Sequence, residues 1–143
     1  VSFLNSWKSG VVRIGQTYTE NNDFVSVAKD FISTHYNFTE GEVLFKPTFT
    51  KQVIFRNNQE DALSYFVKGG ISEDSGFAIK PWEKIDLIDI NIIIENGYCF
   101  CMGVFDLFPL SKDEITKVAF TFILVKDAND SLKIKVHHSS PII

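Results

Sequence analysis

Hydrophobic residues near the start of the chain recur every three or four positions, the spacing of one face of an α-helix. The first apolar stripe consists of Phe3, Trp7, Val11, Ile14 and Tyr18. A second stripe begins after Asp23, whose carboxylate suits the first turn of a helix. Its apolar members are Phe24, Val27, Ala28 and Phe31, and His35 falls one turn beyond them. The pattern predicts two helices within residues 1–36.

The pattern then changes to short extended segments and a third helix. Apolar residues within 42–56 are interrupted by Pro47, which has no N–H for a sheet ladder, so they predict two short edge strands or two extended segments with a break between them. Asn57-Asn58-Gln59-Glu60 is similar to a capping box, and apolar residues within 62–66 predict a short helix that stops at Gly69-Gly70.

The second half of the chain has the pattern of long strands. Asn96-Gly97 is a strong hairpin signal between apolar residues on either side. The predicted strands are residues 85–95, 98–108, 115–126 and 132–139. Alternation fails at Leu87-Ile88, which predicts a bulge or a strand covered on both faces. Helices followed by antiparallel strands predict an α+β domain in which N-terminal helices pack on a curved sheet of four long strands plus short edge strands.

Composition narrows the class of protein. The chain has 143 residues and a net charge of −4, which predicts one domain over residues 1–143 and argues against nucleic acid as a partner. No apolar run approaches the roughly 20 residues that span a bilayer, so no membrane partner is expected. The sequence begins at Val1 instead of Met, so removal of an upstream signal segment stays open, and with it the choice between bacterial cytoplasm and periplasm.

Cys99 and Cys101 would lie side by side on one face of a strand, where disulfide geometry is poor. Two thiols without a nearby His or Asp are also too few for a structural zinc site. The sequence therefore predicts two free thiols, no metal site and no cofactor.

The order of predicted elements resembles the cystatin-like, or nuclear transport factor 2-like, α+β cone. Five local stretches also resemble a family of small bacterial and algal proteins that often carry a phosphoribosyl-AMP cyclohydrolase label. These stretches are residues 44–48, 53–56, 62–66, 73–82 and 137–141. The superfamily includes ketosteroid isomerases, dehydratases, SnoaL-type cyclases and a kinase association domain. The resemblance implies a pocket at the mouth of the cone.

Charged and aromatic side chains in these stretches are the candidates for ligand contact. A charged group beside aromatic rings either forms an ion pair within the protein or binds a ligand. The predicted ligand-binding residues are Lys46, Arg56, Tyr65, Lys80, Trp82, His137 and Ser139. The planar guanidinium of Arg56 suits the carboxylate or phosphate of a ligand, or a carboxylate of the protein itself. The expected ligand is a small molecule, with an anion favoured by these cations.

Three residues are candidates for catalysis. Glu73 and Asp74 could act as an acid/base pair, or could lie on an exposed loop. Strict alternation in the last strand places His138 with the apolar residues and His137 with the lysines, towards solvent or an interface. His138 is therefore the predicted pocket histidine and general base, although a core histidine without a catalytic role fits the same pattern.

Three functional hypotheses remain open, because one fold hosts many functions. The first is a small-ligand-binding domain with an aromatic-lined pocket. The second is an isomerase, dehydratase or hydrolase, with the cyclohydrolase label as one case. The third is a homo-oligomerisation module. Residues 98–108 are apolar on both faces, which predicts a homodimer through the sheet.

Overall fold

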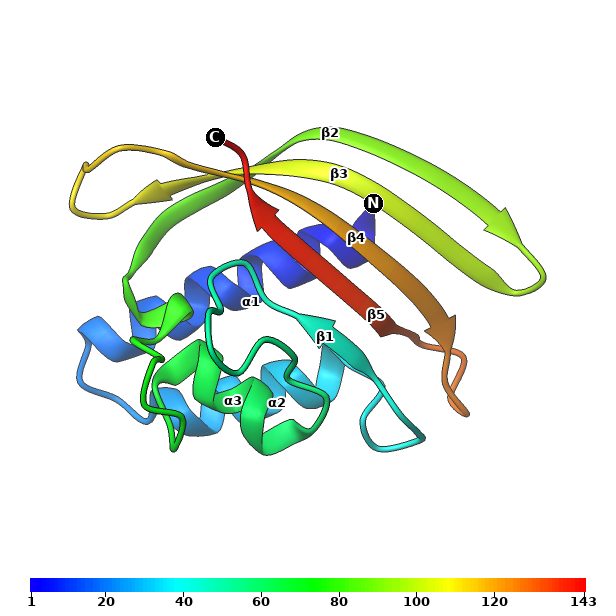
Figure 1. Ribbon diagram of the computed structural model, residues 1–143, viewed down its shortest axis with the longest axis horizontal. Coiled ribbons are helices and arrows are strands. Elements are labelled where there is room, and N and C mark those ends of the chain that lie inside the picture. The colour runs from blue at the N-terminus through cyan, green and yellow to red at the C-terminus, as the bar shows by residue number, and fades with distance from the viewer.

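A curved five-stranded sheet arches over three helices in the computed structural model, which describes residues 1–143 (Figure 1). The helices are α1 (Ser2–Thr19), α2 (Phe24–His35) and α3 (Gln59–Val67). Asp23 caps α2 by accepting from the Ser26 N–H at 3.1 Å, and Asn58 caps α3 by accepting from the Asp61 N–H at 2.8 Å. The three helices predicted from the apolar spacing are confirmed.

The strands follow in the order β1-β5-β4-β3-β2 across the sheet. They are β1 (Leu44–Lys46), β2 (Trp82–Glu95), β3 (Tyr98–Pro109), β4 (Thr116–Lys126) and β5 (Leu132–Pro141), and a 3₁₀ turn, η1 (Phe77–Ile79), precedes β2. The four long strands are antiparallel, but β1 runs parallel to β5, so the sheet is mixed rather than wholly antiparallel as expected. Of the two predicted segments only the first is a strand; residues 52–56 form no strand and join β1 through a backbone bond from the Arg56 N–H to the Phe45 carbonyl at 2.7 Å.

Besides a register shift between Trp82 and Lys84 at the start of β2, two further β-bulges bend the sheet. The bulge predicted in β2 is confirmed, because the register shifts between Leu87 and Asp89. The second bulge lies in β5, where Ile123 pairs with Val136 and Leu124 pairs with Ile134, which leaves Lys135 as the extra residue. A bulge changes which residues of a strand face inwards beyond it. This second bulge decides the orientation of the histidine pair.

Aromatic rings fill the space between the helices and the sheet. Trp7 of α1 stacks on Phe105 at 5.3 Å between ring centres, and Phe105 stacks on Phe120 at 4.3 Å. Phe31 of α2 contacts Phe66 of α3 edge-on at 5.4 Å. The interior is therefore a packed aromatic core, with the larger hollows at the surface.

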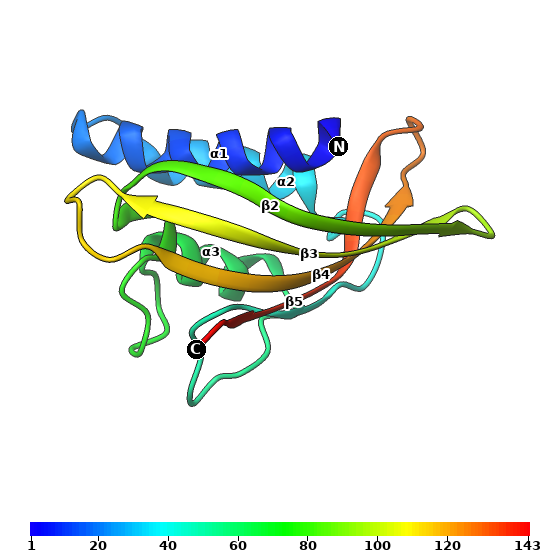
Figure 2. The same ribbon diagram turned by 90° about the horizontal axis from the view of Figure 1, so that it is seen from above.

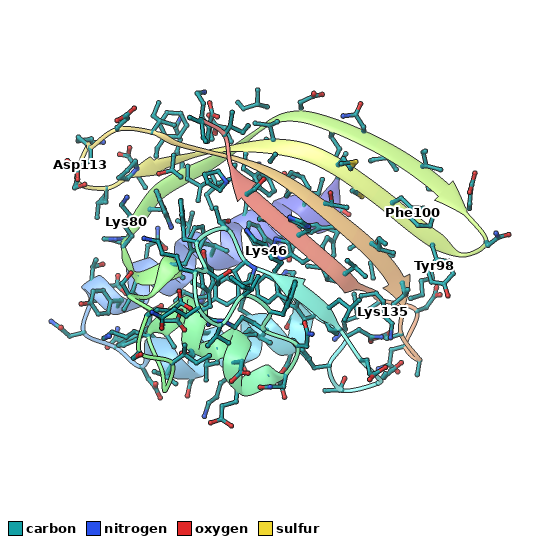
Figure 3. The ribbon with its side chains drawn as sticks, viewed as in Figure 1. Lys46, Lys80, Tyr98, Phe100, Asp113 and Lys135 are labelled. Carbon is teal, nitrogen blue, oxygen red and sulfur yellow. The ribbon has the colours of Figure 1, made fainter.

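The β2–β3 hairpin reaches beyond the helical layer (Figure 2). Tyr98 and Phe100 lie on this hairpin, away from the helices (Figure 3), and are 45% and 37% exposed. Met102 of β3 is 60% exposed. Apolar side chains on the outer face of β3 thus remain uncovered within one chain.

None of the helices combines the length and the hydrophobicity that a membrane-spanning helix needs.

Candidate functional site

A buried chain of hydrogen bonds links α1, the end of α2 and β5. Trp7 Nε1 lies 3.2 Å from the Tyr36 hydroxyl, which lies 2.8 Å from His137 Nδ1. His137 Nε2 in turn lies 2.6 Å from Ser139 Oγ. Tyr36, His137 and Ser139 are all buried, at 0%, 4% and 3% exposure. Burying a series of polar groups in an aromatic core is costly unless each group has a hydrogen-bond partner. The geometry of the series therefore determines which atom carries each proton.

The direction of donation along this series of hydrogen bonds follows from the donors available. The Trp7 indole N–H can only donate, so the Tyr36 oxygen accepts and its own O–H is left for His137 Nδ1. His137 then carries its proton on Nε2 and donates it to Ser139 Oγ. The reverse order would leave the O–H of the wholly buried Tyr36 without an acceptor. The chain therefore ends at Ser139, whose O–H remains free to donate.

The expected orientation of the histidine pair is wrong. His137 is buried and His138 is exposed, the opposite of the prediction. The bulge at Lys135 is the physical reason: one extra residue between Ile134 and Val136 turns His137 and Ser139 to the same side as the buried Ile134. His137 is the buried histidine, whereas His138 lines a hollow of about 390 Å³ on the outer face of the sheet, and its role as general base stays a prediction.

Rings on all sides hold His137 in place and keep it neutral. Phe45 stacks on its imidazole at 4.6 Å between ring centres, and Phe122 contacts it edge-on at the same distance. Burial lowers the pKa of His137 well below its usual value, and the nearby charges of His138 and Lys46 lower it further. A neutral imidazole keeps the single N–H that the direction of the chain requires.

Lys46 and Tyr65 lie next to this series of hydrogen bonds. The Lys46 ammonium donates to the Ser139 carbonyl oxygen at 2.9 Å, and burial lowers its pKa. The parallel register places Phe45 beside His137 and Lys46 beside His138. The polypeptide that follows β1 therefore runs in the same direction as β5, towards Ser139. Tyr65 packs edge-on against Phe45, on the ring that also stacks on His137.

The Tyr65 hydroxyl accepts from the Phe49 N–H at 3.2 Å. Burial raises the pKa of Tyr65 well above its usual value, although hydrogen bonds with the Phe49 N–H and the Thr48 side chain oppose the shift. A hollow of about 60 Å³ adjoins its ring and is lined by Phe49, Tyr65, Glu73, Asp74, Ser75, Gly76 and Phe77. One water needs about 10–15 Å³ by this measure, so the hollow has room for a molecule of a few heavy atoms.

Arg56, Glu73 and Asp74 form a separate, internally paired cluster. Arg56 is wholly buried and forms a bidentate ion pair with Asp74, whose two carboxylate oxygens lie 2.6 and 2.8 Å from the guanidinium nitrogens. Asp74 also accepts from the Ser64 hydroxyl at 2.6 Å. The planar fork of Arg56 therefore holds an internal carboxylate, the alternative that the sequence left open.

Glu73 accepts the backbone N–H groups of residues 51, 52 and 53 at 2.7–2.9 Å. These backbone bonds, and the Arg56 charge, lower the pKa of Glu73. Its carboxylate is thus occupied in shaping the loop of residues 51–53. Glu73 also lies 3.8 Å from the Arg56 guanidinium, so both carboxylates face the same cation, and an acid/base role for Glu73 and Asp74 stays a prediction.

Lys80 and Trp82 lie apart from the buried chain. Figure 3 shows Lys80 near the start of β2, well away from Lys46 at the end of β1. The Lys80 ammonium lies 4.8 Å from the Trp82 ring centre, and Trp82 donates its indole N–H to the Phe77 carbonyl at 2.8 Å. Ligand contact by these two residues stays a prediction.

The structure brings together three of the predicted residues, Lys46, His137 and Ser139, and adds two that the sequence did not single out, Trp7 and Tyr36. Trp7 is visible in the sequence only as part of the first apolar stripe. Tyr36 follows a helix by one residue, and no local pattern distinguishes it. Its partner His137 is 101 residues away, so only the tertiary fold reveals the pair. No group of three or more His, Cys, Asp or Glu side chains converges in the described chain.

Comparison with known structures confirms the nuclear transport factor 2-like cone. A nuclear transport factor 2-like protein from Salmonella enterica superposes with a TM-score of 0.59 at 11% identity, over 99% of this chain and 87% of that one. The hub of the calcium/calmodulin-dependent kinase II of S. rosetta has a TM-score of 0.54 at 15% identity, over 94% and 96%. At these identities the likeness concerns the fold alone.

Two relatives are closer in sequence. A metal-independent carbonic anhydrase from the cyanobacterium Nostoc is 31% identical over 140 residues, which cover 94% of this chain and 68% of the relative. The crystal structure of a cyanobacterial iota-carbonic anhydrase complexed with bicarbonate has a TM-score of 0.93 at 30% identity, over 99% of this chain and 89% of that one. The family profile of metal-independent carbonic anhydrase matches residues 1–141. The cyclohydrolase label suggested by the local stretches is therefore wrong as a family assignment, and the chain belongs to the metal-independent carbonic anhydrase family.

Proposed function

We propose that this protein catalyses the reversible hydration of CO₂ to bicarbonate, and that the free O–H of Ser139 binds an oxygen of the substrate. The observation that carries the proposal is the family match over residues 1–141, supported by a relative that was crystallised with bicarbonate. The buried chain that ends at Ser139 supplies a chemical reason for that assignment.

The reaction needs hydrogen-bond donors where negative charge develops. A water oxygen bonds to the CO₂ carbon, one C=O electron pair moves onto an oxygen, and the water loses a proton. Ser139 donates its O–H to the oxygen that gains charge, and the Lys46 ammonium, bound to the carbonyl of the same residue, adds a positive charge nearby. Both groups are positioned before the substrate arrives, so little reorganisation is needed.

His137 acts as a positioning residue in this scheme. Its two ring nitrogens are engaged by Tyr36 and Ser139, and its lowered pKa keeps it neutral, so it does not take up the proton of the attacking water. The proton passes to solvent or buffer. The effect of His137 on Ser139 is to occupy one lone pair of the Ser139 oxygen with the Nε2 N–H. The Ser139 hydroxyl proton is then directed towards the substrate.

The small hollow beside Tyr65 provides the site for an uncharged substrate. The hollow is lined by three aromatic rings, from Phe49, Tyr65 and Phe77, which suit apolar CO₂. Its carboxylates, Glu73 and Asp74, already have hydrogen-bond partners in Val53 and Arg56. We assign this hollow to CO₂ approach and the Ser139 end of the chain to bicarbonate.

The test is ¹⁸O exchange between CO₂ and water, followed by mass spectrometry on protein treated with EDTA. We expect catalysed exchange that survives chelation. Ser139→Ala should lower kcat roughly 100- to 1000-fold, the usual effect of losing one such donor. Ser140→Ala is the matched control, because Ser140 is the next residue of the strand and lies outside the buried chain.

The results that would contradict the proposal are equally direct. Wild-type protein that exchanges ¹⁸O no faster than buffer would refute the function. A Ser139→Ala variant as fast as wild type would leave the function and refute the site. A melting curve for each variant separates a chemical defect from unfolding, since the His137 N–H left unpaired costs about 1–3 kcal/mol.

A further inference from the structure

A second serine–histidine pair lies between α1 and α2. Ser6 Oγ is 2.8 Å from His35 Nε2, and His35 Nδ1 is 2.8 Å from the carbonyl oxygen of Phe31. A carbonyl oxygen only accepts, so Nδ1 carries the imidazole proton and Nε2 accepts the Ser6 O–H. Burial lowers the pKa of His35, which favours this neutral form. The order serine, imidazole, carbonyl is that of a nucleophile, its general base and the group that orients the base.

This order differs from that of the buried chain described above. At Ser139 the imidazole donates to the serine, whereas at Ser6 the imidazole accepts from it. Only the second arrangement can draw a proton off the serine oxygen. The inference is therefore independent of the proposed CO₂ hydration.

The pair is open to a small molecule. Ser6 is exposed, and both residues line a hollow of about 290 Å³ between the two helices. Gly10 lies one turn after Ser6 on α1 and lines the same hollow, and its lack of a Cβ lets the Phe31 ring pack closely against α1. A volume at the lower end of the roughly 300–1,000 Å³ range of ligand pockets suits a short acyl group.

Arg13 lines the same hollow, one turn beyond Gly10 on the same face of α1. Its guanidinium is the cationic donor available to an oxygen that gains negative charge. Asp30 and Thr34 of α2 line the opposite side. The hollow thus contains a nucleophile, a base, the carbonyl that orients the base, and a cation.

We propose that Ser6 and His35 form a nucleophile–base pair that hydrolyses small carboxylic esters. Ser6 Oγ bonds to the ester carbonyl carbon while its proton moves to His35 Nε2. The bond from that carbon to the alcohol oxygen then breaks, and the alcohol leaves with the proton from Nε2. Water, deprotonated by His35, next attacks the acyl-serine, which releases the carboxylic acid and restores the Ser6 O–H.

The experiment uses the whole chain with two probes, a fluorophosphonate and 4-nitrophenyl acetate. We expect the fluorophosphonate adduct on Ser6 by peptide mass spectrometry, and a burst of 4-nitrophenol of about one equivalent per chain. Ser6→Ala should abolish both. His35→Gln should slow labelling at least about 100-fold, the usual contribution of a general base. Ser9→Ala is the matched control, because Ser9 is exposed on the same helix and lies outside this hollow.

Two results would overturn the proposal. One is the absence of any adduct on Ser6 in folded wild-type protein under conditions that label a serine hydrolase. The other is ester hydrolysis in Ser6→Ala at the wild-type rate, which would place the reaction elsewhere in the chain. If His35→Gln does not fold, Ser6→Ala still decides, because Ser6 is exposed and its replacement leaves the aromatic core intact.

Discussion

The direction of the buried hydrogen-bond chain can be tested by removing one hydroxyl. In Tyr36→Phe, the Trp7 N–H and His137 Nδ1 both lose their partner inside the core. A buried polar group without a partner costs about 1–3 kcal/mol, and the 3.2 Å contact to Trp7 places that residue at the lower end. We expect the free energy of unfolding to fall by about 2–4 kcal/mol in urea titrations.

The same variant has a spectroscopic signature. In the wild type, long-range ¹H–¹⁵N NMR should find the His137 proton on Nε2 and none on Nδ1. Without Tyr36 as donor, Nδ1 is free to carry the proton, so a mixture of tautomers should appear and CO₂ hydration should fall. The matched control is Tyr18→Phe, because Tyr18 is 41% exposed and lies outside the buried chain.

Two results would refute this reasoning. A wild-type His137 with its proton on Nδ1 would reverse the chain and remove the free Ser139 donor. A Tyr36→Phe variant as stable as Tyr18→Phe would show that the hydroxyl is not holding two buried partners.

Three further predictions concern stability and assembly. Burial lowers the pKa of His35 and His137 below 6.5, so the stability they confer is complete above about pH 6.5 and is lost as the pH falls towards their folded values. Urea titrations should show a slope approaching about 1.4 kcal/mol per pH unit for each histidine, and equal stability at pH 7.5 and 5.5 would contradict this. Asp74→Asn removes the nearer of the two carboxylates that pair with the buried Arg56 and leaves only Glu73 at 3.8 Å, so it should cost about 3–5 kcal/mol by the same assay; a loss below about 1 kcal/mol would count against it. The homodimer through the sheet stays a prediction: Met102→Glu should convert it to monomer in sedimentation velocity, and a monomeric wild type would reject it.

The local pattern of the sequence determined the elements of this fold. Apolar spacing located three helices, Asn96-Gly97 located the long hairpin, and Leu87-Ile88 located a bulge. These features depend on near neighbours in the chain, because helix periodicity, capping and turn chemistry act over a few residues. The order of these elements along the chain then indicated the nuclear transport factor 2-like cone, which the solved structures confirm.

The tertiary structure decided what the chemistry-bearing residues do. Glu73 and Asp74 are adjacent in sequence, yet one binds the backbone of residues 51–53 and the other binds Arg56, and neither partner is visible locally. The bulge at Lys135 arises from pairing between β4 and β5, and it alone determines that His137 rather than His138 faces the core. Strand alternation predicts faces only while the register is unbroken, so one inserted residue reversed the histidine pair and placed His137 instead of His138 on the inner side of the sheet.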